Sequence, residues 1–372
     1  MKFFLGLSFL VAALFARAEL SLPRLERSGR LVLPYAVQSM AWQPNGHLFA
    51  IGFFMKDEVS VWNIKEKKHV FSVRSNRLSA NLSGQEILFS LDGRYLITQD
   101  FSDSKAGSPP FPKVLNSPQE LNARKDMQRY VLAKVWDLET RKEVATIKGP
   151  GSIKHGGRHI GMCLFDNGRL LVLLRKGGFT TYELPSGEMI RDVDLSHPFS
   201  DHPKVGRSYE KMACNPSGNE IALAGLQFFR DAEKFGYVNW SGATAIVVAD
   251  VRKGSVKKVL LSETPLNGVV YTKSGNYLAS FGKPPIRVWN AAADFQLTGV
   301  VNDPSLNSGN LVAAGDSERA FGIADQAYIW DLAQLRKVAR FDIPRDVIRV
   351  AEKDNNYAIA EGNTVHFFKL AP

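Results

Sequence analysis

Four of the seven histidines fall in two short stretches, and these side chains are the first candidates for metal chemistry. His155 and His159 belong to the sequence HGGRH, and His197 and His202 lie in the next connecting segment, where Asp201 precedes His202. Imidazole and carboxylate groups bind zinc when three or four of them converge. Neither an HExxH motif nor paired cysteines support such a site. We therefore expect solvent-exposed loop histidines, with a metal site as the alternative.

The sequence contains no recognisable catalytic motif. A G-x-S-x-G nucleophile elbow, a CxxCH haem attachment and a Walker-type phosphate loop are all absent. Most Asp residues stand at turns or strand ends, where their carboxylates can cap backbone N–H groups. We therefore predict no catalytic residues and no cofactor, and the enzymatic alternative rests on side chains scattered through the fold.

The first 18 residues have the pattern of a secretory signal peptide. Lys2 precedes an apolar stretch over residues 3–15, and Ala16-Arg17-Ala18 follows, which predicts cleavage before Glu19. The apolar stretch is too short to cross a bilayer as a helix. No cysteine marks a lipoprotein anchor, and no later window is apolar enough to be a transmembrane segment. We expect an exported protein, periplasmic in a bacterium with two membranes.

Composition places the chain among ordinary globular proteins. It is 45% hydrophobic and 23% charged, which excludes wholesale disorder and fibrous classes. The formal net charge is +10, and the signal peptide contributes two of these charges, Lys2 and Arg17. This modest excess permits contact with anionic lipids or polyanionic polymers, although the cations are scattered along the sequence. Export argues against a nucleic-acid partner.

A short sequence motif, here called a phrase, recurs seven times. It consists of a turn ending in Gly, one further residue, and then two or three apolar residues. A second phrase follows each copy, in which alternating apolar residues close on an aromatic and a polar residue. Period-two alternation bounded by turn residues indicates short strands, and paired strands in units of 40 to 50 residues are typical of propeller blades. The first phrase reads PNGHLFA, LDGRYLI, DNGRLLV, PSGNEIA and KSGNYLA, with degenerate copies at Glu318 and Asn355; the second reads VSVWN, AKVWD, FTTYE, IVVAD, IRVWN, YIWD and VHFFK.

The VWN and VWD endings at Trp62, Trp136 and Trp289, each preceded by a Gly turn, resemble the WD-repeat β-propellers. The resemblance spans the mature chain and implies a seven-bladed propeller of four-stranded antiparallel blades, residues 19–372, whose common role is to scaffold protein interactions. The Gly-His dipeptide of eukaryotic WD repeats is missing from its expected place, so the looser bacterial propellers are the closer comparison.

The seventh unit ends with its third strand, because only Ala371 and Pro372 follow VHFFKL. Residues 28–34, SGRLVLP, precede the first unit and are similar to the outer strands at 69–73 and 143–147. We predict that this N-terminal strand completes the last blade, with an unpaired arm as the alternative.

Two blades carry long insertions between their second and third strands. The distance from the Gly position to the aromatic position is 43 in the second unit and 31 in the fourth, against 12 to 16 elsewhere. These insertions, 100–130 and 226–242, leave the same face of a propeller, and variable loops on a rigid scaffold often bind partners. Their aromatic and cationic residues are the predicted binding residues: Phe101, Phe111, Arg124, Lys125, Arg129, Phe228, Phe229, Arg230, Phe235, Tyr237 and Trp240. The alternative is that these aromatics only anchor the loops to the propeller.

Cys163 and Cys214 are the two cysteines. Aligning Gly168 with Gly218 offsets them by one residue, so their side chains leave opposite faces of adjacent inner strands and could meet between blades 3 and 4. Export permits a disulfide, but we favour two buried thiols.

These observations favour a monomeric, non-enzymatic propeller that binds another envelope protein or peptide through the loops over blades 2 to 4. An immunity protein, an inhibitor or an envelope-assembly protein would each use such a face. The alternative is a propeller enzyme, of the lactonase, lyase or dehydrogenase type, with its site in the central channel. Fold alone does not decide between them.

Overall fold

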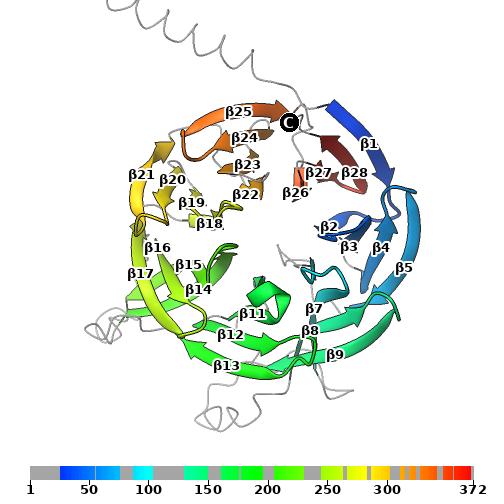
Figure 1. Ribbon diagram of the computed structural model, residues 1–372, viewed down its shortest axis with the longest axis horizontal. Helices are drawn as coiled ribbons and strands as arrows, with labels where there is room; N and C mark the ends of the chain where they lie inside the picture. Colours follow the sequence, from blue (N-terminus) through cyan, green and yellow to red (C-terminus); the bar gives the residue numbers. More distant parts are fainter. Residues whose placement is uncertain are drawn as a thin grey trace, which may run out of the picture.

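A computed structural model describes residues 26–54, 56–75, 87–103, 130–149, 161–175, 177–195, 205–229, 244–262, 266–282, 286–301, 311–314, 318–323, 327–341, 347–354 and 356–369. These residues form seven four-stranded antiparallel sheets arranged as blades in a ring around a central axis (Figure 1). This confirms the seven-bladed β-propeller. The predicted signal peptide, residues 1–18, lies outside the described residues.

The first strand of each blade lies nearest the central axis and the fourth lies on the rim (Figure 1). Blades 1 to 3 consist of β2 (Val37–Trp42), β3 (Leu48–Phe53), β4 (Glu58–Asn63) and β5 (Lys68–Arg74); β6 (Ile87–Phe89), β7 (Tyr95–Asp103), β8 (Tyr130–Asp137) and β9 (Lys142–Gly149); β10 (Met162–Phe165), β11 (Leu170–Arg175), β12 (Gly178–Glu183) and β13 (Met189–Asp194). A single 3-10 turn, η3 (Asp166–Gly168), joins β10 to β11.

Blades 4 to 6 follow the same plan, and blade 7 takes its outer strand from the N-terminus. Their strands are β14 (Val205–Cys214), β15 (Glu220–Phe229), β16 (Thr244–Asp250) and β17 (Ser255–Ser262); β18 (Leu266–Tyr271), β19 (Tyr277–Gly282), β20 (Ile286–Asn290) and β21 (Gln296–Val301); β22 (Leu311–Ala314), β23 (Arg319–Ile323), β24 (Ala327–Asp331) and β25 (Arg336–Phe341); β26 (Val347–Lys353), β27 (Asn356–Glu361), β28 (Thr364–Lys369) and β1 (Glu26–Val32).

Strand β1 closes the ring, as the sequence predicts. It pairs antiparallel with β28, from Glu26 opposite Lys369 to Val32 opposite Thr364. The strand begins two residues earlier than the predicted segment, and its register shifts between Arg27 and Gly29. The edge of β28 is thereby covered, and an uncovered strand edge is a hazard for aggregation.

The hydrophobic core is divided among seven clusters of buried side chains, and each cluster fills the joint between two neighbouring blades. The repeated aromatic position on the third strand packs toward the preceding blade in every joint. Burying such a side chain stabilises the fold by about 1.5–3 kcal/mol. The residues at this position, from blade 1 to blade 7, are Trp62, Trp136, Tyr182, Ala249, Trp289, Trp330 and Phe368.

The Asp or Asn that follows this position caps the turn between the third and fourth strands. Asp137 Oδ1 accepts hydrogen bonds from the backbone N–H groups of Glu139 and Thr140, at 3.0 and 2.9 Å. Asp250 and Asp331 each accept from the backbone N–H three residues on, at 2.8 and 2.9 Å. This capping role, which the sequence predicts, explains why the VWD and VWN phrases end in Asp or Asn.

The hairpin turns that join first to second and third to fourth strands form one face of the ring, the turn face. Here a side chain of one blade repeatedly bonds a backbone carbonyl of the next: Gln43 Nε2 donates to Gly93 O at 2.7 Å and Asn215 Nδ2 to Gly275 O at 3.4 Å. Gly275 has φ +79°, and a Cβ there would collide with Asn215 Oδ1. Glycine at this turn therefore allows the neighbouring blade to approach.

Among the described residues, no helix has the length and hydropathy that a bilayer crossing requires.

Candidate functional site

The opposite face, the loop face, carries the connections between second and third strands and between blades. The strands that lead into the two insertions are long: β7 has 9 residues and β14 and β15 have 10 each, against 6 in β3. Blades 2 and 4 thus extend farther toward this face than blade 1 does.

Three of the sequence-predicted binding residues lie on these long strands. Phe101 belongs to β7, and Phe228 and Phe229 end β15, where they pair with Gly206 and Val205 at the loop-face end of blade 4. The other predicted binding residues lie outside the described part of the chain: Phe111, Arg124, Lys125, Arg129, Arg230, Phe235, Tyr237 and Trp240.

The four candidate metal ligands, His155, His159, His197 and His202, also lie outside the described residues. Within the part that the structure describes, His, Cys, Asp and Glu side chains form no group of three that could hold a metal.

The loop face of blade 1 exposes two aromatic side chains that sequence reasoning missed. Tyr35 is 42% exposed and Phe54 is 41% exposed, although the preceding Phe53 is fully buried. Lys56 Nζ lies 4.2 Å from the Tyr35 ring centroid, within cation–π range. The ring of Tyr35 also meets Phe53 edge-on at 5.8 Å. We call Tyr35, Phe54 and Lys56 the blade 1 aromatic patch.

The sequence does contain one signal for this patch, which is the pair of consecutive phenylalanines at the end of β3. Successive side chains of a strand point to opposite sides, so Phe53 and Phe54 cannot both enter one core. The rest of the patch could not be read from the sequence, because Tyr35 and Phe54 come from different connections and are brought together by the hydrogen bond from Phe54 N to Ala36 O, at 2.8 Å.

Hydrogen bonds connect this patch to the base of the blade 2 insertion. Ser75 N donates to Asp57 O at 3.2 Å, and Ser75 Oγ donates to Gln99 O on β7 at 2.6 Å. Strand β7 leads directly into the blade 2 insertion. The loop-face connection of blade 1 is therefore joined to strand β7 of blade 2 by hydrogen bonds.

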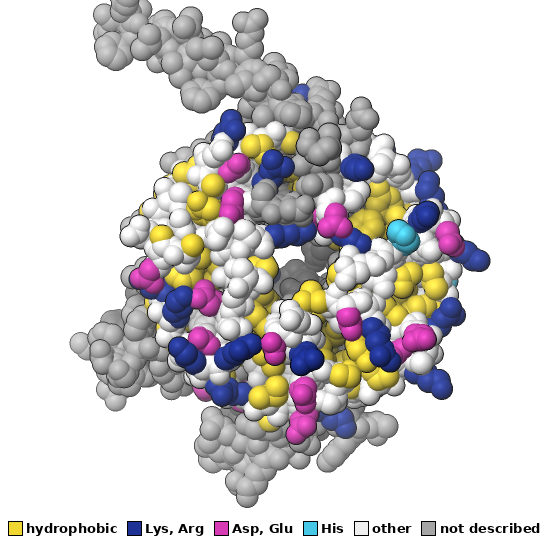
Figure 2. Space-filling model, viewed as in Figure 1, with side chains coloured by type: hydrophobic (Ala, Val, Ile, Leu, Met, Phe, Trp, Pro, Cys, Tyr) yellow, Lys and Arg dark blue, Asp and Glu magenta, His cyan; other side chains and the backbone are white. Residues whose placement is uncertain are grey.

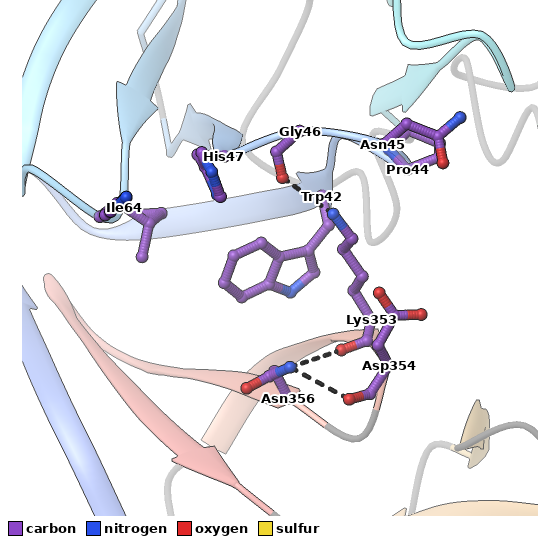
Figure 3. A pocket seen from close by; sticks show the side chains of 10 residues that line it. Trp42, Pro44, Asn45, Gly46, His47, Ile64, Lys353, Asp354 and Asn356 are labelled. Carbon is purple, nitrogen blue, oxygen red and sulfur yellow. Dashed lines mark hydrogen bonds between the residues drawn. The ribbon is translucent and has the colours of Figure 1, made fainter.

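A pocket of about 550 Å³ lies on the turn face between blades 7 and 1 (Figure 3). Trp42 lies in its wall, and Lys353 Nζ crosses to Gly46 O at 2.8 Å. Asn356 Nδ2 holds the β26–β27 turn through Lys353 O and Asp354 O, at 3.2 and 3.1 Å. The lining residues are Trp42, Pro44, Asn45, Gly46, His47, Ile64, Lys65, Lys353, Asp354 and Asn356.

The indole Nε1 of Trp42 is buried and has no hydrogen-bond acceptor among the described residues. A buried donor left in this state costs about 1–3 kcal/mol. The ring packs against Phe49 and Phe367, with centroids 4.5 and 5.9 Å away. The pocket therefore combines an aromatic wall with cations, amides and one carboxylate.

A Ser, His and Glu cluster on blade 1 does not have the geometry of a nucleophilic triad. Ser72 Oγ lies 2.9 Å from His69 Nε2 but donates its proton to Glu58 Oε1 at 2.6 Å. In a triad the carboxylate holds the far nitrogen of the histidine, and the histidine takes the serine proton. Here the carboxylate competes for that proton, so the cluster is a surface hydrogen-bond network.

Among the tryptophans at the end of the third strands, the one in blade 2 makes a buried side-chain hydrogen bond. Trp136 Nε1 donates to Thr98 Oγ1 on the neighbouring strand at 2.9 Å. The Nε1 groups of Trp62 and Trp330 are buried without an acceptor in the described residues. The tryptophans therefore act mainly as apolar filling of the joints.

Cys163 and Cys214 form a disulfide across the joint between blades 3 and 4, with Cα atoms 6.1 Å apart. Our prediction of two buried thiols is therefore wrong. The offset of one residue does bring the side chains together, as we inferred, and the joint has Ala249 where most others have an aromatic. Tyr209 fills part of this joint, and its OH donates to Leu195 O at 2.8 Å.

The surroundings of Asp137 and Tyr271 shift the pKa values of both side chains. The backbone N–H of Thr140 and the Arg94 guanidinium, whose Nε lies 3.0 Å from Oδ2, hold the pKa of Asp137 below its usual range. Burial raises the pKa of the Tyr271 phenol well above its usual value. Both groups keep one protonation state at neutral pH, which suits structural roles better than proton transfer.

No protein-family model matches this sequence, and a search of curated proteins finds no significant match.

Proposed function

We propose that this protein is an exported, WD-repeat-like propeller that binds another envelope protein or peptide through its loop face. The observation that carries the proposal is the blade 1 aromatic patch. Two large aromatic side chains remain exposed there although burial would stabilise them. Exposed aromatics beside a cation are typical of the centres of protein interfaces.

The loop lengths support the same face. Loops that vary on a constant scaffold are where binding residues concentrate. The connection from β7 to β8 spans residues 104–129, and that from β15 to β16 spans 230–243, whereas that from β3 to β4 spans only 54–57. Hydrogen bonds through Ser75 join the patch to Gln99 of β7, the strand that leads into the first of these insertions.

The export part of the proposal rests on the pattern of residues 1–18. N-terminal sequencing of the protein purified from its native cells tests it. We expect the mature chain to begin at Glu19. A chain that retains residues 1–18 and stays with the cytoplasmic fraction contradicts export.

The binding part is tested by affinity capture of the tagged mature protein from an envelope extract, with partners identified by mass spectrometry. The test variant is Tyr35→Ser with Phe54→Ser. The matched control is Ile190→Ser with Leu297→Ser, which removes two exposed apolar side chains from the outer strands of blades 3 and 5. We expect the patch variant to lose the partner and the control to keep it.

Replacement of residues 104–129 by a short Gly-Ser linker extends this test to the blade 2 insertion. The proposal predicts loss of the same partner. A partner that is retained by the patch variant and by the linker variant, or is lost equally from the control, contradicts binding through this face.

A further inference from the structure

Six exposed cations gather on three consecutive outer strands of the ring. Strands β1, β5 and β9 form the rim of blades 7, 1 and 2, and Figure 2 shows Lys and Arg side chains along the edge over β5 and β9. Although scattered in the sequence, these cations lie on the outer strands of three consecutive blades. We call them the basic arc: Arg27, Arg30, Lys68, Arg74, Lys142 and Lys148.

The basic arc differs from the rim of blade 4 in how its charges are compensated. There, Lys257 pairs with Glu220, and Lys258 Nζ lies 2.7 Å from Asp294 Oδ2. Lys253 likewise lies near Asp250. In the part of the chain that the structure describes, no carboxylate forms an ion pair with any member of the arc. The arc therefore keeps its positive charge for an external anion.

The shape of the rim selects a chain-like anion over a flat one. The three strands follow the circumference of the ring, so the arc is convex (Figure 1). A planar bilayer can touch only part of a convex rim at once, whereas a flexible linear polyanion can follow it. Binding of a polyanion to clustered cations releases its counterions and weakens steeply with salt.

The arc lacks the stacking groups that single-stranded nucleic acids use. Proteins that bind single strands place bases on exposed aromatic rings along a basic groove. The single Phe, Tyr or Trp on β1, β5 and β9 is Phe71, which is half-buried, with the Arg141 guanidinium 5.5 Å from its ring centroid. A polyanion without bases fits this surface better.

The turn-face pocket lies directly beside the arc and indicates what kind of polyanion fits. Lys65 lines the pocket and stands three residues before Lys68 of β5. The pocket offers acceptors for hydroxyl groups in the Asp354 carboxylate and the Asn356 amide oxygen, and donors in Lys65 and Lys353. Its volume of about 550 Å³ lies in the range of small-ligand sites.

We propose that the basic arc and this pocket together bind an acidic polysaccharide. The chain lies along β9, β5 and β1, and one sugar unit enters the pocket, with its ring against Trp42 and its hydroxyl groups on Asp354 and Asn356. This site does not include the blade 1 aromatic patch and does not depend on the function proposed above.

The test is fluorescence anisotropy with a labelled oligogalacturonate long enough to span three blades. The arc variant is Lys68→Gln, Lys142→Gln and Lys148→Gln. The control is Lys253→Gln, Lys257→Gln and Lys258→Gln, which removes the same charge from blade 4. We expect the arc variant to bind about tenfold or more weakly and the control to bind within about twofold of the parent, with affinity falling as salt rises.

A second variant tests the pocket. Asp354→Asn makes the protein more positive, so charge attraction alone predicts tighter binding of every polyanion. Our proposal predicts instead that the ratio of oligogalacturonate affinity to poly-L-glutamate affinity falls, because one of the two carboxylate oxygens that accept from sugar hydroxyl groups is replaced by an amide N–H donor. Position 354 has φ +49°, which Asn also tolerates, so folding should be unchanged.

Three results would overturn the proposal. One is an equal loss in the arc variant and the blade 4 control. Another is binding of single-stranded DNA of matched charge, or of phosphatidylglycerol vesicles, as tight as that of the oligogalacturonate. The third is an unchanged saccharide preference in Asp354→Asn.

Discussion

The two faces of the propeller use their side chains differently. On the turn face, polar side chains are engaged in holding the ring: Gln43, Asn215 and Lys353 each bond a backbone carbonyl of the following blade. On the loop face of blade 1, Tyr35 and Phe54 extend toward solvent. The difference indicates that substitutions on the turn face should cost stability, whereas substitutions on the loop face should cost binding.

The largest expected loss of stability comes from the covalent link between blades 3 and 4. Cys163 lies in β10 and Cys214 ends β14, and their bond closes a loop across 51 residues of sequence. Cys163→Ser with Cys214→Ser should lower the free energy of unfolding by about 2–4 kcal/mol, since the unfolded chain regains freedom. Denaturant unfolding measures this, and partner binding should persist.

Reduction of the parent protein is the control for this variant. Dithiothreitol should lower the stability of the parent to that of the double variant and leave the variant unchanged. Equal stability of the parent with and without reductant contradicts a stabilising disulfide.

The next largest effect is expected at Asn215. Its side chain is buried, donates to Gly275 O in blade 5 and accepts from Ser217 N at 3.0 Å. Asn215→Ala leaves these groups unpaired and should cost about 1–3 kcal/mol. Asn276→Ala is the control, because Asn276 is exposed and its bond to Glu318 should contribute little. Equal losses of unfolding free energy in both variants would show that the hydrogen bond between Asn215 and Gly275 does not stabilise the protein.

Asp137 should make a smaller, pH-dependent contribution. Because the pKa of Asp137 is lowered in the folded protein, its stabilising effect is present above the unfolded pKa and is lost as pH falls through the folded value. Asp137→Asn should therefore be less stable than the parent at neutral pH, and the gap should narrow in acid. Urea unfolding at several pH values checks this, and a gap independent of pH contradicts it.

The smallest effect is expected at Lys67, in the turn before β5. Its φ is +53°, where Gly187 and Gly254 stand in the equivalent turns of blades 3 and 4. Lys67→Gly relieves the left-handed strain and should stabilise the protein by up to about 1 kcal/mol, despite the entropy of glycine. Thermal unfolding measures it; a clear destabilisation would show that the turn carries no strain.

The blades could be predicted from the sequence because each repeat carries its own local cause. The Gly turns, the alternating third strands and the residues capping the next turn, such as Asp137 and Asp331, act within a few residues of one another. Closure by the N-terminal strand followed from counting strands. The bulge between Arg27 and Gly29 did not, because it depends on pairing with β28.

The sites were harder to predict because they join residues that are distant in the sequence. The six cations of the basic arc come from β1, β5 and β9, so they look scattered until the ring is closed. The disulfide depends on how the inner strands of two blades face each other. The pocket likewise combines Trp42 of the first blade with Lys353 of the last.

Photo-crosslinking from one position on each face tests the central claim most directly. Phe54 on the loop face and Leu91 on the turn face are both large, apolar and exposed, at 41% and 48%. Each is replaced in turn by p-benzoyl-phenylalanine, and the producing cells are irradiated. The account predicts a partner crosslinked through position 54 and none through position 91. A partner captured at position 91 and absent at position 54 would contradict it.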